Sequence, residues 1–319
     1  MENNLFRPVK LSEFFGQSNI TENLKIFIYS AKKRKTVLDH MIFYGPPGLG
    51  KTSLAYIIAE EMSSKIMVIN ASSLEKISDL VSILSILEEG SILFIDEIHR
   101  MNKEIEETLY SVMEDFVLNI AYKNDENTKA LSVKISPFTL IGATTMQNLI
   151  STPLMNRFGI AFKFNYYSIS SLKEIIINNA SKINLNITKK ACNLIAERSR
   201  YTPRISNNIL KRVFDYKIYK NIDIIDENNI IDAFNVLNIF EYGLNEFDIR
   251  ILKIMYKKFR YTPVSIEVIS SILNEDANNI KFVNEPFLVN SNFIERTKRG
   301  RVLTKKSILF LEKNQINEY

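Results

Sequence analysis

The sequence predicts an α/β domain with a parallel sheet flanked by helices, then an all-α unit, then a small unit of helices and a short β-ribbon. Three observations lead to this fold class. In the first half of the chain, short apolar segments alternate with amphipathic helical segments, as in parallel sheets covered on both faces. A glycine-rich loop joins the first strand to a helix. After about Tyr167 the strand pattern stops and helical periodicity takes over.

The α/β domain is expected over residues 1–168, with a helical region at 10–35 ahead of the first strand. The expected strands are His40–Tyr44, Lys65–Asn70, Ser91–Ile95 and Phe138–Thr144. The helices expected between them are Thr52–Met62, Asp79–Glu88 and Asn102–Asp115. Two alternating segments around Lys123–Lys129 predict an inserted β-hairpin.

The all-α unit is expected over residues 169–240 and the last unit over 241–319. The first of these should contain the amphipathic helices Ile169–Ser181, Thr188–Ser199, Pro203–Tyr219 and Asp226–Leu237. The second should contain helices at Glu246–Phe259, Val264–Leu273 and Asp276–Val289, followed by short strands around Phe293–Thr304. Three helices followed by a β-ribbon predict a winged helix.

Composition excludes several classes of protein. The 319 residues are enough for two or three domains, and 46% hydrophobic with 24% charged residues is ordinary globular usage. One cysteine excludes an internal disulfide framework and a Cys-rich zinc site. We find no basic-then-apolar leader and no run near the ~18 apolar residues of a membrane helix, so we expect a cytoplasmic protein. The net charge of +5 permits nucleic-acid binding without requiring it.

Residues 45–52 read Gly-Pro-Pro-Gly-Leu-Gly-Lys-Thr and fit the phosphate-loop pattern G-x-x-x-x-G-K-[ST]. Gly45, Gly48 and Gly50 would let backbone N–H groups wrap a phosphate, and the following helix would add the positive end of its dipole. Lys51 would add a point charge, and the Thr52 hydroxyl would ligate Mg²⁺. The alternative is a turn that only connects strand to helix. It is the weaker interpretation because three of only nine glycines fall in this stretch.

A second motif is the apolar segment Ile92–Ile95, which ends in Asp96 and Glu97. Parallel sheets place their ligands at this carboxyl edge. Asp96 would hold Mg²⁺ through water, and Glu97 would act as general base on the attacking water. Alone, the pattern also fits a solvated strand end; the upstream phosphate loop favours the catalytic interpretation.

A series of short motifs resembles the RuvB family of AAA+ ATPases. In chain order these are Arg7-Pro8 with Phe14–Gln17, the loop at 45–52, Phe94–Arg100, Met113–Phe116, Phe138–Thr145, Pro153-Leu154 with Arg157–Gly159, Thr202–Ile205 and Arg296–Val302. The loop alone is common to very many nucleotide hydrolases, whereas the ordered set is specific. The resemblance implies an ATP- and Mg²⁺-dependent motor of Holliday-junction branch migration in recombination and repair, acting as a homo-oligomeric ring, expected to be a hexamer.

The resemblance also implies roles for single residues. Thr145, or its neighbour Thr144, would be sensor 1, with Met146 standing where the family usually has Arg. Arg157 would be an arginine finger reaching the neighbouring subunit's nucleotide, and Arg204 would be sensor 2 within its own subunit. Phe6, Arg7 and Tyr167 would line the adenine pocket. The full set expected to contact nucleotide is Phe6, Arg7, Gly45, Gly48, Leu49, Gly50, Lys51, Thr52, Ser53, Glu114, Asp115, Phe116, Thr144, Tyr167 and Arg204.

The ribbon of the last unit is strongly basic. Arg296, Arg299 and Arg301 are expected to contact DNA phosphates, which bind without reading sequence. A solvated basic loop is the alternative, and Lys298 replaces the family's usual Pro. The DNA would be the duplex arms of a four-way junction.

The hairpin insert lies where the family docks its junction-binding partner. The alternating Ile120, Tyr122, Leu131, Val133 and Ile135 could form an exposed apolar contact for a RuvA-like protein. A hairpin packed on its own domain is the alternative. A RuvC-like resolvase is a further expected partner.

Two other functions remain open from the sequence. One is a clamp-loader-type AAA+ switch acting on a protein ring, although such proteins generally lack a basic winged helix. The other is a DNA-binding regulator with a degenerate ATPase, against which the intact Lys51, Asp96 and Glu97 argue.

Overall fold

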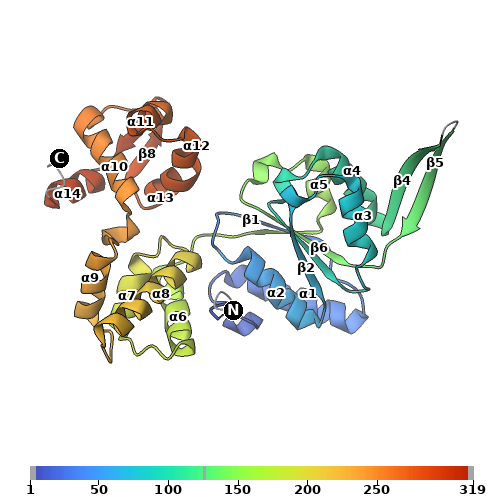
Figure 1. Cartoon of the computed structure of the whole chain (residues 1–319), viewed down its shortest axis with the longest axis horizontal. Coiled ribbons are helices and arrows are strands. Elements are labelled where there is room, and N and C mark those ends of the chain that lie inside the picture. The colour runs from blue at the N-terminus through green and yellow to red at the C-terminus, as the bar shows by residue number, and fades with distance from the viewer. Residues whose placement is uncertain (1–4, 125–126, 315–319) are drawn as a thin grey trace. The chain divides into compact units, whose positions relative to one another are not determined.

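The computed structural model describes residues 5–124 and 127–314 (Figure 1). The chain divides into two compact units. Unit 1 consists of Met1–Lys182 with Thr202–Asn207, and unit 2 of Ile183–Tyr201 with Asn208–Tyr319. Among the helices of the described residues, none combines the length and apolar character needed to span a membrane.

Unit 1 contains a five-stranded parallel sheet in the order β2-β3-β6-β1-β7. Its strands are β1 (Met41–Tyr44), β2 (Ile66–Asn70), β3 (Ile92–Asp96), β6 (Thr139–Thr144) and β7 (Ile160–Lys163). Because all strands run the same way, the carboxyl ends of β1, β3 and β6 meet at one edge of the sheet. This edge carries the phosphate loop and the acidic strand end.

Helices cover both faces of this sheet. They are α1 (Ser18–Arg34), α2 (Lys51–Met62), α3 (Ile77–Ser85), α4 (Lys103–Asp115) and α5 (Thr152–Arg157). The helix α6 (Ile169–Lys182) follows β7 and does not cover the sheet. In Figure 1, α1 and α2 lie on one side of the sheet and α3 and α4 on the other. The arrangement agrees with the predicted parallel sheet flanked by helices.

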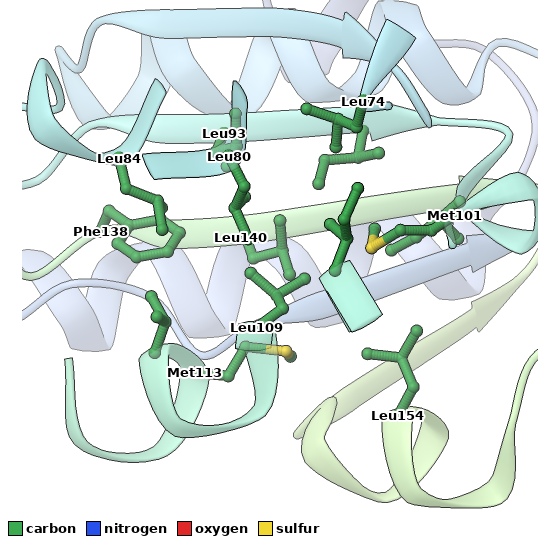
Figure 2. Packing of buried hydrophobic residues seen from close by; sticks show 14 of the residues in the cluster. Leu74, Leu80, Leu84, Leu93, Met101, Leu109, Met113, Phe138, Leu140 and Leu154 are labelled. Atoms are coloured by element: carbon green, nitrogen blue, oxygen red, sulfur yellow. The ribbon is translucent and has the colours of Figure 1, made fainter. Parts of the chain in front are cut away.

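An apolar core fills the space between the sheet and the helices α3 and α4 (Figure 2). Leu93 of β3 and Leu140 of β6 meet Leu80 of α3 and Leu109 of α4, and all four side chains are fully buried. Phe94 alternates with these strand residues and points to the opposite face, which explains why β3 is apolar throughout. Each fully buried leucine stabilises the fold by roughly 2 kcal/mol through removal of apolar surface from water.

The sequence patterns did not predict β7 or α5. The strand β7 has four residues and the helix α5 has six, so neither is long enough to show a clear period. A local signal for α5 does exist, since Ser151 caps it by accepting a hydrogen bond from Leu154 N–H at 3.2 Å.

The inserted hairpin is present, with β4 (Val117–Asn124) and β5 (Asn127–Lys134) paired antiparallel. Val133 is exposed, as expected for a contact surface. Ile135 corrects the prediction: it is 8% exposed and belongs to the core of unit 1, because it follows β5 at the base of the hairpin. The side chains of Ile120, Tyr122 and Leu131 lie outside the described residues.

Unit 2 combines helices with the expected β-ribbon. The helices are α7 (Lys189–Glu197), α8 (Pro203–Lys220, its first turn in unit 1), α9 (Glu227–Val236), α10 (Glu246–Ile254), α11 (Ile266–Leu273), α12 (Ala277–Asn279), α13 (Glu285–Asn290) and α14 (Lys305–Lys313). Two π-helical turns, Met255–Phe259 and Ile280–Asn284, continue α10 and join α12 to α13. The ribbon is β8 (Ile294–Thr297) with β9 (Gly300–Leu303). The terminal α14 was not predicted, although Thr304 caps it.

Candidate nucleotide site and basic wing

The phosphate loop runs from the end of β1 into α2. The first hydrogen bond of α2 runs from Leu54 N–H to Gly50 O at 2.9 Å, so the N–H groups just ahead of Leu54 have no acceptor within the helix. Gly45, Gly48 and Gly50 have φ values of 142°, 78° and 98°, which L-residues rarely adopt. A Cβ on Gly45 would lie 2.5 Å from the Phe164 carbonyl oxygen. The loop therefore needs its glycines for both backbone angle and space.

Lys51 is a buried cation that forms no ion pair with any residue that the structure describes. Its side chain donates from Nζ to Gly45 O at 2.8 Å and Pro46 O at 2.9 Å, both neutral carbonyls. Burial lowers the pKa of Lys51 to about 8; the charge of Asp96 raises this pKa, and that of Arg204 lowers it. A phosphate bound in the loop would stabilise this cation. The residues present therefore fit a polyphosphate ligand.

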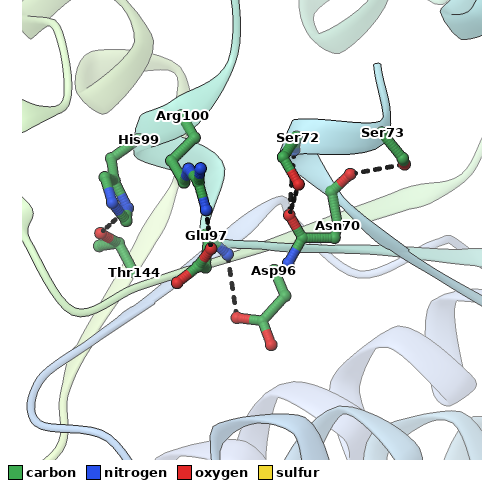
Figure 3. A network of polar contacts seen from close by, with 8 residues as sticks. All are labelled: Asn70, Ser72, Ser73, Asp96, Glu97, His99, Arg100 and Thr144. Carbon is green, nitrogen blue, oxygen red and sulfur yellow. Dashed lines mark hydrogen bonds and ion pairs between the residues drawn. The ribbon is translucent and has the colours of Figure 1, made fainter. Parts of the chain in front are cut away.

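The acidic end of β3 lies beside the end of β2 (Figure 3). Asp96 Oδ1 accepts the Glu97 N–H at 2.9 Å, and Glu97 adopts the left-handed conformation with φ 50°. Glu97 Oε2 is bonded to Arg100 Nη1 at 3.0 Å. The two carboxylates that the sequence assigned to metal and water thus lie at the carboxyl edge.

The oxygen donors of Thr52 and Asp96 suit Mg²⁺. Within the described residues, no group of three or more His, Cys, Asp or Glu side chains could enclose a metal ion. Mg²⁺ itself is usually held by one or two protein oxygens together with water and substrate phosphates.

Thr144 and Thr145 differ in environment at the end of β6. Thr144 is buried; its Oγ1 accepts the Met146 N–H at 2.9 Å and lies 2.9 Å from His99 Nδ1 (Figure 3). Burial lowers the pKa of His99 below its ordinary value, which favours a neutral ring. Thr145 follows the strand and is exposed. The hydroxyl of Thr144 is therefore engaged within the protein, whereas Thr145 faces solvent.

Arg204 lies against the phosphate loop in unit 1. Its N–H donates to Gly48 O at 3.3 Å, and a Cβ on Gly48 would lie 3.1 Å from the Arg204 Cβ. The predicted sensor 2 is thus brought next to the loop by the first turn of α8, at a position with an exposed side chain.

Of the predicted adenine-pocket residues, Tyr167 contacts the phosphate loop directly. Tyr167 is buried and its hydroxyl donates to Leu49 O at 3.1 Å; burial raises the pKa of this phenol. Phe6 is 8% exposed, and the Arg7 guanidinium lies 4.3 Å from the Tyr56 ring centroid. Tyr167 therefore holds the phosphate loop in place through this hydrogen bond, in addition to its predicted contact with adenine.

Glu114, Asp115 and Phe116 lie at the opposite edge of the sheet. His40, directly ahead of β1, donates from Nε2 to Met113 O at 3.0 Å, because its Nδ1 accepts the Leu140 N–H. The end of α4 therefore meets the start of β1, whereas the phosphate loop follows its end. These three residues lie at the end of the sheet opposite the phosphate loop of their own subunit, and their contact with nucleotide stays a prediction.

Arg157 lies at this opposite edge as well. It ends α5, just ahead of β7, whose first residue Ile160 is in register with Met41 at the start of β1. Arg157 Nε lies 3.3 Å from Glu114 Oε1, and the guanidinium lies 4.1 Å from the Tyr110 ring centroid. Neither Glu114 nor Tyr110 was identified as a partner of Arg157 from the sequence.

The basic wing of unit 2 is organised around a buried carboxylate that sequence reasoning missed. Glu285 is 2% exposed, and its Oε1 accepts from Arg296 Nε at 2.7 Å and Arg301 Nε at 2.8 Å. Burial alone would raise the pKa of Glu285, but the bonds from Arg301 and Arg296 lower it overall. Arg299 lies in the exposed turn ahead of Gly300, whose φ of 138° suits glycine. No acidic side chain of the described residues forms an ion pair with Arg299.

Comparison with known proteins places this geometry in a family. Models of three RuvB domains match in order along the chain. They are the Holliday junction DNA helicase RuvB P-loop domain over residues 6–164, the RuvB AAA lid domain over 167–240 and the RuvB C-terminal winged helix domain over 241–312. The chain belongs to the RuvB family. The match confirms the family resemblance and the fold class inferred from the motifs.

RuvB relatives match over nearly the full chain. The Holliday junction branch migration complex subunit RuvB of Campylobacter hominis is 45% identical over 301 residues, covering 94% of this chain and 88% of the relative. The Thermotoga maritima protein of the same name is 43% identical over 306 residues, covering 96% and 92%. The solved structure of the Thermotoga maritima RuvB Holliday junction branch migration motor matches with a TM-score of 0.85 at 42% identity, covering 97% of this chain and 98% of that one.

Proposed function

We propose that this protein is an ATP-driven motor of Holliday-junction branch migration, acting in homologous recombination and DNA repair. The observation that carries the proposal is the buried Lys51, which lies near Asp96 and Arg204 but forms no ion pair with any described residue, in a chain of the RuvB family. RuvB relatives are named as subunits of the branch migration complex, and a solved RuvB is named as its motor.

The residues of unit 1 divide the work of ATP hydrolysis. The loop N–H groups and Lys51 would hold the phosphates, with Thr52 and Asp96 as the oxygen donors for Mg²⁺. The bound ion would supply neutralisation of phosphate charge. Glu97 would accept the proton of the attacking water, and Thr145 would orient that water or the γ-phosphate. Arg204 would contact phosphate as the lid element of the same subunit.

Arg157 would complete the site of a neighbouring subunit. It lies at the edge of the sheet opposite its own phosphate loop, on α5 ahead of β7. Four residues of β1, about 13 Å of strand, already separate those edges, so this arginine is far better placed to serve another subunit. Hydrolysis would then require assembly into a ring, which we propose to be a hexamer.

The wing and the hairpin would make the contacts outside the ring. Arg296, Arg299 and Arg301 would bind phosphates of the duplex arms, which suits a motor that must move on any sequence. The hairpin of β4 and β5 would dock a RuvA-like junction-binding protein, with Val133 on its exposed surface. A RuvC-like resolvase would act on the same junction, and the cytoplasm would be the compartment.

The decisive experiment measures branch migration of a synthetic four-way junction by the purified full chain with its RuvA-like partner and ATP-Mg²⁺. Migration that needs ATP and is lost in Lys51→Ala supports the proposal. ATP hydrolysis that responds to a sliding clamp but not to junction DNA would contradict it and favour the clamp-loader alternative.

A further inference from the structure

A buried ion pair in unit 2 links the segment before α8 to the winged helix. Asp248, on α10, is 0% exposed, and its Oδ2 accepts a bond from Arg200 Nη2. Arg200 lies in the connection between α7 and α8, and its side chain is 13% exposed. A charged pair this far from water holds its partners in one geometry, because either charge alone would be left unpaired in the protein interior.

Arg200 is fixed by more than its charge. Its Nε donates to Gly243 O at 2.8 Å, and its guanidinium lies 4.3 Å from the Phe287 ring centroid. Arg200 and Tyr201 both adopt positive φ, 50° and 58°, which L-residues adopt only when the surrounding structure enforces it. Three separate contacts with residues 243–287 therefore hold a backbone segment that would otherwise relax.

The contacts of the Asp248 carboxylate extend further toward the wing. Asp248 Oδ1 accepts from Asn284 Nδ2 at 2.8 Å, and Asn284 is 3% exposed. The next residue, Glu285, is the buried acceptor of Arg296 and Arg301, one from each wing strand. Side-chain bonds from Arg200 to Asp248 and Asn284, the peptide bond to Glu285, and the ion pairs of Glu285 thus connect Arg200 to Arg296 and Arg301, two of the arginines proposed to touch DNA.

We propose that Arg200 is a positioning residue that couples the lid to the DNA-contacting wing. Its contacts with Asp248, and through Asp248 with Asn284 and Glu285, join the segment between α7 and α8 to the winged helix. These two parts of unit 2 therefore move as one rigid body. Arg204, proposed to sense nucleotide, lies only four residues further along the chain, so covalent continuity brings the nucleotide signal to this relay. The inference rests on the proposed motor function and adds to it the route by which movement reaches DNA.

The test compares ATP hydrolysis with junction migration in the full chain, using its RuvA-like partner and a synthetic four-way junction. Arg200→Met removes the relay's first donor. Arg200→Lys keeps a charge for Asp248 but has one nitrogen in place of the Nε and Nη2 that reach Gly243 and Asp248 separately, and it serves as the variant less prone to misfold. Arg212→Met is the matched control, because Arg212 forms an exposed pair with Asp215 at 2.9 Å on α8.

The expected result is a split between the two activities. Both Arg200 variants should hydrolyse ATP at close to the wild-type rate, while base pairs migrated per ATP fall about tenfold in Arg200→Met and less in Arg200→Lys. Arg212→Met should change neither quantity. An unchanged migration per ATP in a folded Arg200 variant overturns the proposal, as does a parallel loss of both activities.

A distance measurement separates this inference from the motor function itself. Labels at Lys190→Cys in α7 and Leu309→Cys in α14, in a Cys192→Ala background, report the distance between lid and winged helix without ATP or DNA. With Arg200 present, the distances between the two labels should form one narrow distribution. In Arg200→Met this distance distribution should broaden. Equal widths would contradict the relay even if branch migration occurs, and a narrow-to-broad change would support it even if the wild-type chain moves no junction.

Discussion

The phosphate loop and the wing each contain one buried charge, and the two differ in how that charge is satisfied. Lys51 is bonded only to neutral carbonyls among the described residues, and burial lowers its pKa. Glu285 is bonded to two arginines, and its pKa is lowered by them despite burial. A buried charge that forms no ion pair within its own protein indicates a site for a ligand, whereas a paired one indicates a scaffold. The loop is thus built to receive an anion, and the base of the wing is already complete.

The largest effect should come from removing the unmatched cation. Lys51→Ala should lower ATP turnover by about 10³-fold or more, because charge developing on the phosphates loses its nearest cation. A coupled phosphate-release assay with junction DNA measures this. Lys65→Ala, which removes an exposed cation paired with Glu88, is the matched control and should retain activity. Similar turnover in both variants would contradict the assignment of the loop.

Arg157→Ala should also lower turnover by about 10³-fold, the lower end for an arginine supplied by a neighbour. Mixing Arg157→Ala with Lys51→Ala subunits should restore part of the activity, because each supplies what the other lacks at a shared interface. The readout is phosphate release as a function of mixing ratio. If mixtures stay as inactive as the separate variants while assembling normally, the arginine does not act between subunits.

Glu285→Gln should destabilise the protein by about 1–3 kcal/mol at pH 7, because two arginines lose their shared carboxylate. The folded-state pKa of Glu285 is lowered, so its stabilisation is present above the unfolded pKa and is lost as pH falls through the folded one. Urea midpoints of wild type and variant should therefore converge in acid. Glu295→Gln, at an exposed wing position, should leave the midpoint unchanged. If the difference in urea midpoint between wild type and Glu285→Gln is the same at every pH, the ionised carboxylate of Glu285 is not the source of the stabilisation.

Arg299→Ala should produce the smallest change. It should weaken duplex binding equally for all sequences and reduce the salt dependence, the slope of log K against log salt, by about 1. Thermal stability should stay within about 0.5 kcal/mol, since the side chain is exposed. Binding at several salt concentrations checks both statements, and an unchanged slope would exclude a phosphate contact by this residue.

Local motifs predicted that the glycine-rich loop and the Asp96–Glu97 pair follow strands of a parallel sheet, because each motif consists of neighbours in sequence. The loop at 45–52 and the Asp96–Glu97 pair could be recognised residue by residue, and the sheet follows from alternating strands and helices. The difference between Thr144 and Thr145 needed the structure, since only the positions of His99 and the Met146 N–H show that the Thr144 hydroxyl is already engaged. The assignment of Thr145 as sensor 1 stays a prediction.

The scaffold contacts could not be predicted in this way. Asp248 pairs with a residue 48 positions away and Glu285 with residues 11 and 16 positions away, so no local period reports them. The prediction that Ile135 is exposed was wrong for a related reason. Alternation shows which side chains share a face of the hairpin, but not where the hairpin joins its domain. These contacts depend on tertiary packing rather than on local pattern.

Proton uptake on nucleotide binding tests the central claim most directly. Because the pKa of Lys51 is lowered to about 8, its amine is incompletely protonated at pH 8, and a bound polyphosphate should raise this pKa. Calorimetric titration with a non-hydrolysable ATP analogue and Mg²⁺, in buffers of different ionisation enthalpy, should show proton uptake at pH 8 and less uptake at pH 6.5. Binding without uptake at pH 8, or no binding to the wild-type chain, would contradict the account.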